Sequence, residues 1–299
     1  STINSLGLMM VALGSRSVTA AMFYLFVHGF FKALLFLAAG NVLHATDRGA
    51  VDELGGLRAK MPLTALAFGV GTLAMAGLFP FSGFWAKDEI LVAAREDQGV
   101  AVNVVLWVSV ALTALYMARL YILTFLGRPR DPHAYEHAHE ASLVMLAPVL
   151  LLALGAVVTG FWAFDQVGEA LALPGGVGKF IYLHEPHSFE MPVAEAAGSS
   201  ALVVASLLLA GFIWSGEARP AQLMAQRLRP LYQLLWNKYY MDDLYQWIVN
   251  RIVLATGAMV AWFDRVVVND TGVDGSAGLT ALWGWIMRQV QTGKMPNYA

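Results

Sequence analysis

The chain has 299 residues, of which 58% are hydrophobic and 13% are charged, and its formal net charge is -2. It is far more apolar than a soluble globular domain, so we expect most of it to be buried in lipid. The small net charge and the lack of a basic stripe with interleaved aromatic residues argue against nucleic-acid binding. The absence of cysteine excludes disulfides, thiolate metal sites and cysteine nucleophiles.

Apolar segments separated by short charged loops follow one another along the first 214 residues. A segment must cover a hydrocarbon core of about 30 Å at roughly 1.5 Å per residue, so Ile3 to Gly14 is too short alone and is interpreted as the tail of a span. Longer segments predict five membrane spans: Val18 to Ala45, Pro62 to Ala94, Val102 to Leu126, Ser142 to Phe164, and Ser199 to Trp214.

The second of these predicted spans is overlong and contains helix breakers at its centre. Pro80 lies between Gly77 and Gly83, within the sequence Phe-Pro-Phe-Ser-Gly. Proline removes a backbone donor and clashes with the preceding turn, so a broken helix is expected here. Inside a membrane, such a break is tolerated only where protein or a water-filled cavity satisfies the freed backbone groups.

The charges in the loops predict the orientation of the bundle. If the spans are taken in order, one side carries most of the basic residues, and that side is expected to be cytoplasmic. These residues are Arg48, Arg58, Lys60, Arg128, Arg130, Arg219, Arg227 and Arg229.

Beyond Gly216 the pattern becomes amphipathic. Residues Ala221 to Leu235 show apolar side chains at helical spacing among glutamines and arginines, which indicates a helix with one apolar face. In Leu244 to Val268 only twelve consecutive residues, Ile252 to Phe263, lack charge, too few to cross a bilayer. We therefore predict an interfacial helix along the cytoplasmic face, with a sixth span as the alternative.

The first candidate functional residues lie within the span that begins at Val18. Tyr24, His28 and Lys32 are four residues apart, so they share one face of a helix and can form a hydrogen-bonded chain with bridging waters. A charged lysine in mid-membrane costs roughly 2.5 to 3.5 kcal/mol on insertion scales, which suggests a functional role. Lys32 is too deep in its segment to reach the interface easily, whereas His28 alone is also typical of a core histidine.

Lys87 is the second buried cation, and it follows the Pro80 break. Asp88 and Glu89 come directly after it, and opposite charges near a lysine stabilise its protonated form. Lys87, Asp88 and Glu89 together are interpreted as a switchable proton site. The alternative is that Lys87 extends to the membrane surface and has no function.

Three histidines, His133, His137 and His139, lie in a loop with Glu136 and Glu140. Their spacing superficially suggests a metal site, but no fourth ligand follows from the sequence. We expect no bound metal.

Three motifs resemble the antiporter-like proton-pumping subunits of respiratory complex I, NADH:quinone oxidoreductase. The first begins at His28 and reads His-Gly-Phe-Phe-Lys-Ala-Leu-Leu-Phe-Leu-Ala-Ala-Gly. The second is Gly-Gly-Leu, which begins at Gly55, together with Met61-Pro62. The third begins at Pro80 and reads Pro-Phe-Ser-Gly-Phe-Trp-Ala-Lys-Asp-Glu-Ile-Leu. The tail motifs, Asn-Lys-Tyr-Tyr-Met-Asp-Asp-Leu-Tyr from Asn237 and Gln-Thr-Gly-Lys-Met-Pro-Asn-Tyr-Ala from Gln291, are similar to the distal L-subunit family, also called the F chain.

The resemblance implies a transmembrane helix bundle with one broken helix, followed by a long amphipathic lateral helix on the cytoplasmic face. It implies that residues 1–126 form part of the second antiporter-like repeat, 127–216 two further spans, and 217–299 the lateral helix region. Lys32 would relay protons at the centre with His28, and Lys87 with Asp88 would form the outlet. Tyr24 departs from the pattern, in which a second histidine is common. The chain would then be the C-terminal half of a longer subunit, without the first of two inverted repeats.

The resemblance also implies the cofactors and partners. No glycine-rich nucleotide loop or iron-sulfur cysteine is present, so this chain is expected to bind no cofactor, with NADH, FMN, iron-sulfur clusters and quinone in partner subunits. Neighbouring antiporter-like subunits would contact the lateral helix, and lipid would surround the spans. The expected location is multi-pass in the bacterial plasma membrane, with thylakoid or mitochondrial inner membranes as alternatives. A sodium/proton antiporter subunit, a membrane-bound hydrogenase-type complex and a purely structural clamp are the alternative functions.

Overall fold

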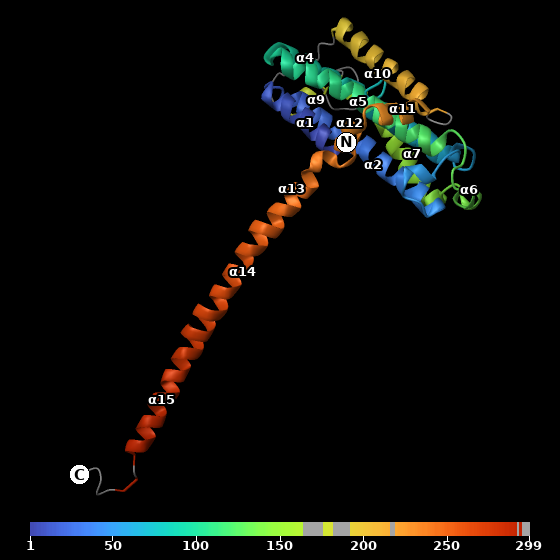
Figure 1. Ribbon diagram of the computed structural model, residues 1–299. Coiled ribbons are helices and arrows are strands. Elements are labelled where there is room, and N and C mark those ends of the chain that lie inside the picture. The colour runs from blue at the N-terminus through green and yellow to red at the C-terminus, as the bar shows by residue number, and fades with distance from the viewer. Residues whose placement is uncertain (164–175, 182–191, 216–218, 292, 295–299) are drawn as a thin grey trace. The chain divides into compact units, whose positions relative to one another are not determined.

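The computed structural model describes residues 1–163, 176–181, 192–215, 219–291 and 293–294, and within these ranges it contains helices and no strands. Figure 1 shows the helices, which fall into two units, Ser1–Met224 and Ala225–Ala299. The prediction of an all-α membrane protein with a broken helix and a long C-terminal helical region is confirmed. The predicted divisions after residues 126 and 216 stay predictions.

The first unit is a bundle of helices. Helices α2, α5, α10 and the run Leu143–Ala163 are long and apolar enough to cross a membrane, which confirms four of the five predicted spans. The longer helices are α1 (Thr2–Gly14), α2 (Val18–Thr46), α3 (Pro62–Ala76), α4 (Ser82–Asp97), α5 (Val100–Phe125), α7 (Leu143–Val158) and α10 (Val193–Trp214). The short elements are η1 (Val51–Glu53), η2 (Leu57–Ala59), α6 (Pro132–His137), η3 (Thr159–Ala163) and α9 (Gly176–Ile181).

The fifth predicted span is divided at the predicted break into α3 and α4. Helix α3 ends because Gly77 adopts a left-handed conformation, with φ 84° and ψ 41°, that glycine accepts without strain. Gly83, in the first turn of α4, lies so close to α3 that a Cβ atom there would overlap the carbonyl oxygen of Ala74. Glycine at these two positions lets the two half-helices meet backbone to backbone.

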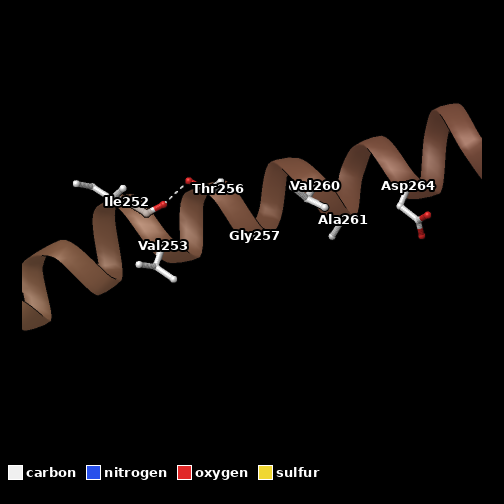
Figure 2. A pocket seen from close by; sticks show the side chains of 7 residues that line it. All are labelled: Ile252, Val253, Thr256, Gly257, Val260, Ala261 and Asp264. Carbon is white, nitrogen blue, oxygen red and sulfur yellow. Dashed lines mark hydrogen bonds between the residues drawn. The ribbon is translucent and has the colours of Figure 1, made fainter.

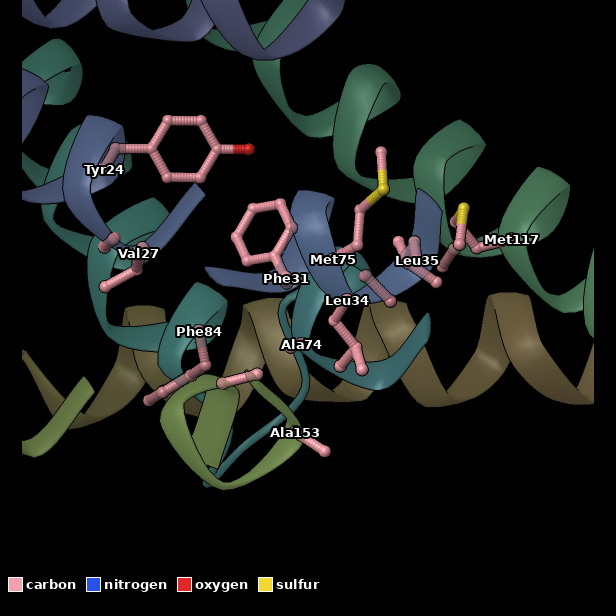
Figure 3. Close-up of a cluster of buried hydrophobic side chains, with 14 of the residues drawn as sticks. Tyr24, Val27, Phe31, Leu34, Leu35, Ala74, Met75, Phe84, Met117 and Ala153 are labelled. Carbon is pink, nitrogen blue, oxygen red and sulfur yellow. The ribbon is translucent and has the colours of Figure 1, made fainter. Parts of the chain in front are cut away.

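Helix α2 lies at the centre of the first unit and packs against α1, α3, α4 and α7. Its side chains Val27, Phe31 and Leu34 are fully buried, and Figure 3 shows them facing Met75 of α3 and Phe84 of α4. This close packing fixes the polar groups of α2 relative to the break between α3 and α4.

The loop between α2 and α3 meets the loop between α5 and α7 at one end of the bundle. The Arg48 Nε atom donates to Asp131 Oδ2 at 3.0 Å, and a guanidinium nitrogen of Arg130 donates to the Leu54 carbonyl oxygen at 2.8 Å. Spans that alternate in direction bring these two loops to the same side, as the sequence predicts for the basic side.

The second unit is a long helical run preceded by a sharp turn. After α11 (Arg219–Arg227), which crosses the boundary between the units, come α12 (Arg229–Trp236) and the turn η4 (Lys238–Tyr240), where Tyr239 has φ 58°. The run then comprises α13 (Met241–Ile248), η5 (Val249–Val253), α14 (Leu254–Phe263), η6 (Asp264–Asp274) and α15 (Gly275–Val290), of which η5 and η6 are π-helical. These elements follow one another without a gap from Met241 to Val290.

This run also satisfies the length and hydropathy criteria for a membrane span, over the 53 residues Lys238–Val290. Such a helix is about 80 Å long, well beyond the roughly 30 Å of hydrocarbon that a span must cross. Its length therefore favours the lateral helix that the sequence predicts. Its place along the membrane stays a prediction.

Candidate functional site

Three polar side chains lie along one side of α2. Tyr24 is 1% exposed and its ring centroid lies 6.0 Å from that of His28, while Lys32, one turn further, is 8% exposed. Tyr24 donates its hydroxyl hydrogen to Ser5 Oγ at 3.2 Å, and Lys32 Nζ donates to Ser1 Oγ. Both contacts reach the N-terminal segment that contains α1, so the row of polar groups on α2 faces this helix, as expected from the spacing of four residues.

Lys87 lies at the break between α3 and α4. Its side chain is 4% exposed, and Nζ donates to the Met75 carbonyl oxygen at 2.6 Å. Met75 is in the last turn of α3, where carbonyl groups have no partner within the helix and the helix dipole is negative. The ammonium group is therefore held by a helix terminus. Its aliphatic chain passes over Gly77, where an added Cβ atom would lie 3.1 Å from Lys87 Cδ.

Asp88 is buried on another side of the same helix. Its exposure is 2%, and Ser199 Oγ of α10 donates to Asp88 Oδ1 at 3.0 Å. Successive residues on a helix point about 100° apart, so Lys87 and Asp88 contact different elements. Among the described residues no ion pair joins them, so the expected stabilisation of Lys87 by a direct contact with Asp88 is not seen.

The structure brings three of the four predicted site residues together. His28 and Lys32 are one turn apart on α2, and α2 packs against α4, which carries Lys87. Asp88 instead faces α10. His28 Nε2 and Asp88 Oδ2 are buried and have no hydrogen-bond partner in the described part of the chain. Buried polar atoms are normally hydrogen-bonded to protein or water, so each of these two atoms can accept or donate one further hydrogen bond.

Three partners of the predicted site residues were missed by reasoning from the sequence, namely Ser1, the Met75 carbonyl oxygen and Ser199. The Met75 carbonyl oxygen is a backbone atom, and only the helix break next to it points to its availability. Ser199 is 111 positions from Asp88, and no sequence spacing pairs them. One signal was present, since Ser199 and Ser206 are seven residues apart and therefore share one face of a mostly apolar helix.

The remaining candidates do not form a site. The rings of His133 and His137 stack at 4.4 Å, but no group of three or more His, Asp or Glu side chains in the described ranges could hold a metal ion. A shallow hollow follows α14, and Figure 2 shows that its lining side chains, from Ile252 to Asp264, all come from one helical run.

Comparison with known proteins relates this arrangement to a family. Residues 1–115 match the family described as NADH:quinone oxidoreductase/Mrp antiporter, TM. The whole chain aligns with NADH-quinone oxidoreductase subunit L of Neisseria meningitidis, at 33% identity over 343 residues and 49% of that protein. It also aligns throughout with NAD(P)H-quinone oxidoreductase chain 5 of a Picosynechococcus species, at 31% identity and 49% of that protein. The chain is therefore similar to the NADH:quinone oxidoreductase/Mrp antiporter family over residues 1–115, and to NADH-quinone oxidoreductase subunits throughout.

Solved structures show the same fold. A chain of the archaeal membrane-bound sulfane sulfur reductase superposes with a TM-score of 0.63 and 20% identity, over 95% of this chain and 50% of that one. This antiporter-like chain spans about half the length of the curated relatives it matches. It is an integral membrane protein by its family and by its apolar helices.

Proposed function

We propose that this chain is part of a proton-translocating membrane-arm subunit of NADH:quinone oxidoreductase. Lys32, His28, Lys87 and Asp88 are its proton relay. The observation that carries the proposal is the pair of buried lysines, Lys32 on α2 and Lys87 on α4, because these helices pack against one another and α2 is long and apolar enough to cross a membrane. Buried charges in a membrane bundle are costly, and they typically lie on proton or ion pathways.

The geometry supports a relay through water. Lys32 and Lys87 are both nearly inaccessible, and His28 lies between Tyr24 and Lys32 with a buried, unpartnered Nε2 among the described residues. Two ammonium groups on helices that pack against one another repel, so in this relay a proton arriving at one would promote release from the other. Bridging waters then carry the proton between groups that do not touch.

The redox chemistry belongs to other subunits. The chain has no cysteine to ligate an iron-sulfur cluster. NADH, FMN, iron-sulfur clusters and quinone are therefore assigned to partner subunits of the complex. The helical run Met241–Val290 is assigned to the cytoplasmic face, where its exposed apolar side chains would contact neighbouring antiporter-like subunits and lipid headgroups.

The test uses the whole complex containing this chain, in vesicles, with NADH and quinone as substrates. Lys32→Ala and Lys87→Ala are each expected to slow proton transfer through this subunit roughly tenfold or more, because a positioned proton-transfer group is lost. Lys60→Ala is the matched control, because Lys60 is an exposed lysine in the loop before α3. Unchanged pumping in both buried-lysine variants would reject the proposed relay.

A sodium/proton antiporter subunit is the second candidate, because the matching family also includes Mrp antiporters. Such a subunit would exchange sodium for protons without NADH or quinone. Vesicles that acidify or alkalinise in response to a sodium gradient alone would favour it, and a response only during NADH oxidation would favour the complex I function.

A further inference from the structure

Ser199 has one hydroxyl hydrogen and two acceptors within reach. Its Oγ atom lies 3.0 Å from Asp88 Oδ1 and 3.2 Å from the carbonyl oxygen of Ala196, one turn earlier in α10. A serine hydroxyl donates a single hydrogen bond and rotates to suit its surroundings. At any moment the hydrogen can therefore point toward the carboxylate or toward the backbone, but not toward both.

We propose that Ser199 is a positioning residue that holds the ionised form of Asp88 and releases its hydrogen bond when Asp88 is protonated. This inference rests on the proposed proton relay and adds a residue to it. Both partners are nearly inaccessible, with exposures of 4% for Ser199 and 2% for Asp88. In such surroundings a hydrogen bond to an ionised group is worth more than one to a neutral group.

The states with Asp88 ionised and with Asp88 protonated differ by one proton, which Asp88 gains or loses. With Asp88 ionised, the Ser199 hydroxyl donates to Oδ1 and the Ala196 carbonyl keeps its helical partner. When a proton adds to Asp88, on the buried Oδ2 that has no partner among the described residues, the carboxyl group becomes a donor and needs less from Ser199. The hydroxyl then turns to the Ala196 carbonyl, as serines within helices commonly do. No bond other than the O–H bond of Asp88 forms or breaks.

A second contact keeps α10 in place for this exchange. Arg95 of α4 forms an ion pair with Glu195 of α10, and Glu195 is one turn before Ser199. Asp88 and Arg95 follow one another along α4, whereas their partners Ser199 and Glu195 come in the reverse order along α10. The two helices therefore run antiparallel at this contact. These two side-chain contacts between the same helices restrict the distance between the Ser199 hydroxyl and the Asp88 carboxylate.

The test compares variants of the assembled complex by proton pumping and by infrared spectroscopy. The carbonyl stretch of protonated Asp88 is identified by its loss in Asp88→Asn. Ser199→Ala is expected to shift that band and to slow pumping about threefold to tenfold, where tenfold corresponds to about 1.4 kcal/mol for one hydrogen bond to a charged group. Ser199→Thr keeps the hydroxyl and should restore both properties toward those of the native chain.

Ser206→Ala is the matched control, because Ser206 is a buried serine on the same face of α10, two turns further on. An Asp88 band that is the same in Ser199→Ala and Ser206→Ala would overturn the inference, even if Asp88→Asn stops pumping and so supports the relay. A shifted band in Ser199→Ala together with normal pumping in Asp88→Asn would instead reject the role of Asp88 in the relay while keeping the contact. If Ser199→Ala does not assemble, Ser199→Cys, a weaker donor of similar size, must shift the band for the inference to stand.

Discussion

Glu140 anchors the half-helix that carries the Lys87 acceptor, and replacing it should loosen that helix. Helix α3 begins with Pro62 at its first turn, and its N-cap residue Met61 has no side-chain capping bond. The carboxylate of Glu140 replaces this cap, accepting from the Leu63 amide at 2.7 Å and from the Thr64 amide at 3.3 Å. A further bond from Thr64 Oγ1, at 2.6 Å, binds the second carboxylate oxygen.

The free-energy cost of losing this contact is the sum of a helix-capping contribution and a helix-dipole contribution. A helix N-cap contributes about 0.5 to 2 kcal/mol, and a negative charge at a helix N-terminus adds about 0.3 to 1 kcal/mol. We expect Glu140→Ala to destabilise the subunit by about 1 to 3 kcal/mol and Glu140→Gln by less, because the amide oxygen still accepts while the charge is lost.

The measurement is thermal unfolding of the whole subunit in detergent, followed by tryptophan fluorescence at low and high salt. Glu136→Ala is the matched control, because this carboxylate is exposed and lies in the short helix α6, in the same connection between α5 and α7. The Glu140→Gln difference should shrink at high salt, since the helix-dipole contribution is screened. Equal melting temperatures for Glu140→Ala and Glu136→Ala would refute the argument that Glu140 caps α3.

Two further predictions concern packing and pH. Gly83→Ala should destabilise the subunit by about 1 to 3 kcal/mol, because its new methyl group overlaps the Ala74 carbonyl. The control is Gly40→Ala, whose methyl group meets nothing within 4 Å and should stabilise α2 slightly. Equal melting temperatures for the two variants would contradict the close approach of α3 and α4. Asp131 lies in a loop outside the spans, and the backbone amide of Ala134 and the Arg48 side chain lower its pKa below the ordinary 3.8. A depressed pKa stabilises the folded state above pH 3.8, and this stabilisation is lost as the pH falls through the lowered value. The native chain should therefore be more stable than Asp131→Asn near neutrality, and the difference should vanish in strong acid. Thermal unfolding of both chains across this pH range measures the difference.

The helices could be predicted from the sequence because membrane burial leaves a local signal. A run of about twenty apolar residues is visible without any tertiary information, and α2, α5, α7 with η3, and α10 follow from it. The break between α3 and α4 was equally local, because Pro80, Gly77 and Gly83 change the backbone at their own positions. The start of α10 was less evident from the sequence, since the helix begins at Val193, earlier than the predicted Ser199.

The contacts of the site could not be predicted in the same way. Lys32 and Lys87 stand out as charges in apolar segments, but their partners are set by helix packing. Sequence adjacency suggested that Asp88 would stabilise Lys87, whereas the rotation of about 100° per residue directs Asp88 toward Ser199 on α10. Pairs that are far apart along the chain leave no periodic pattern in a single sequence.

The different surroundings of Lys87 and Asp88 affect how they can be coupled. Because Lys87 binds the Met75 carbonyl of α3 and Asp88 accepts from Ser199 of α10, a change at one group reaches the other through α4 itself. The start of α4 is held firmly, since Trp85 Nε1 donates to the Pro80 carbonyl at 3.0 Å. A shift or rotation of α4 that lengthens the Lys87 contact therefore also alters the Asp88 contact. Coupling between these two groups would therefore act through a movement of α4 rather than through a direct ion pair.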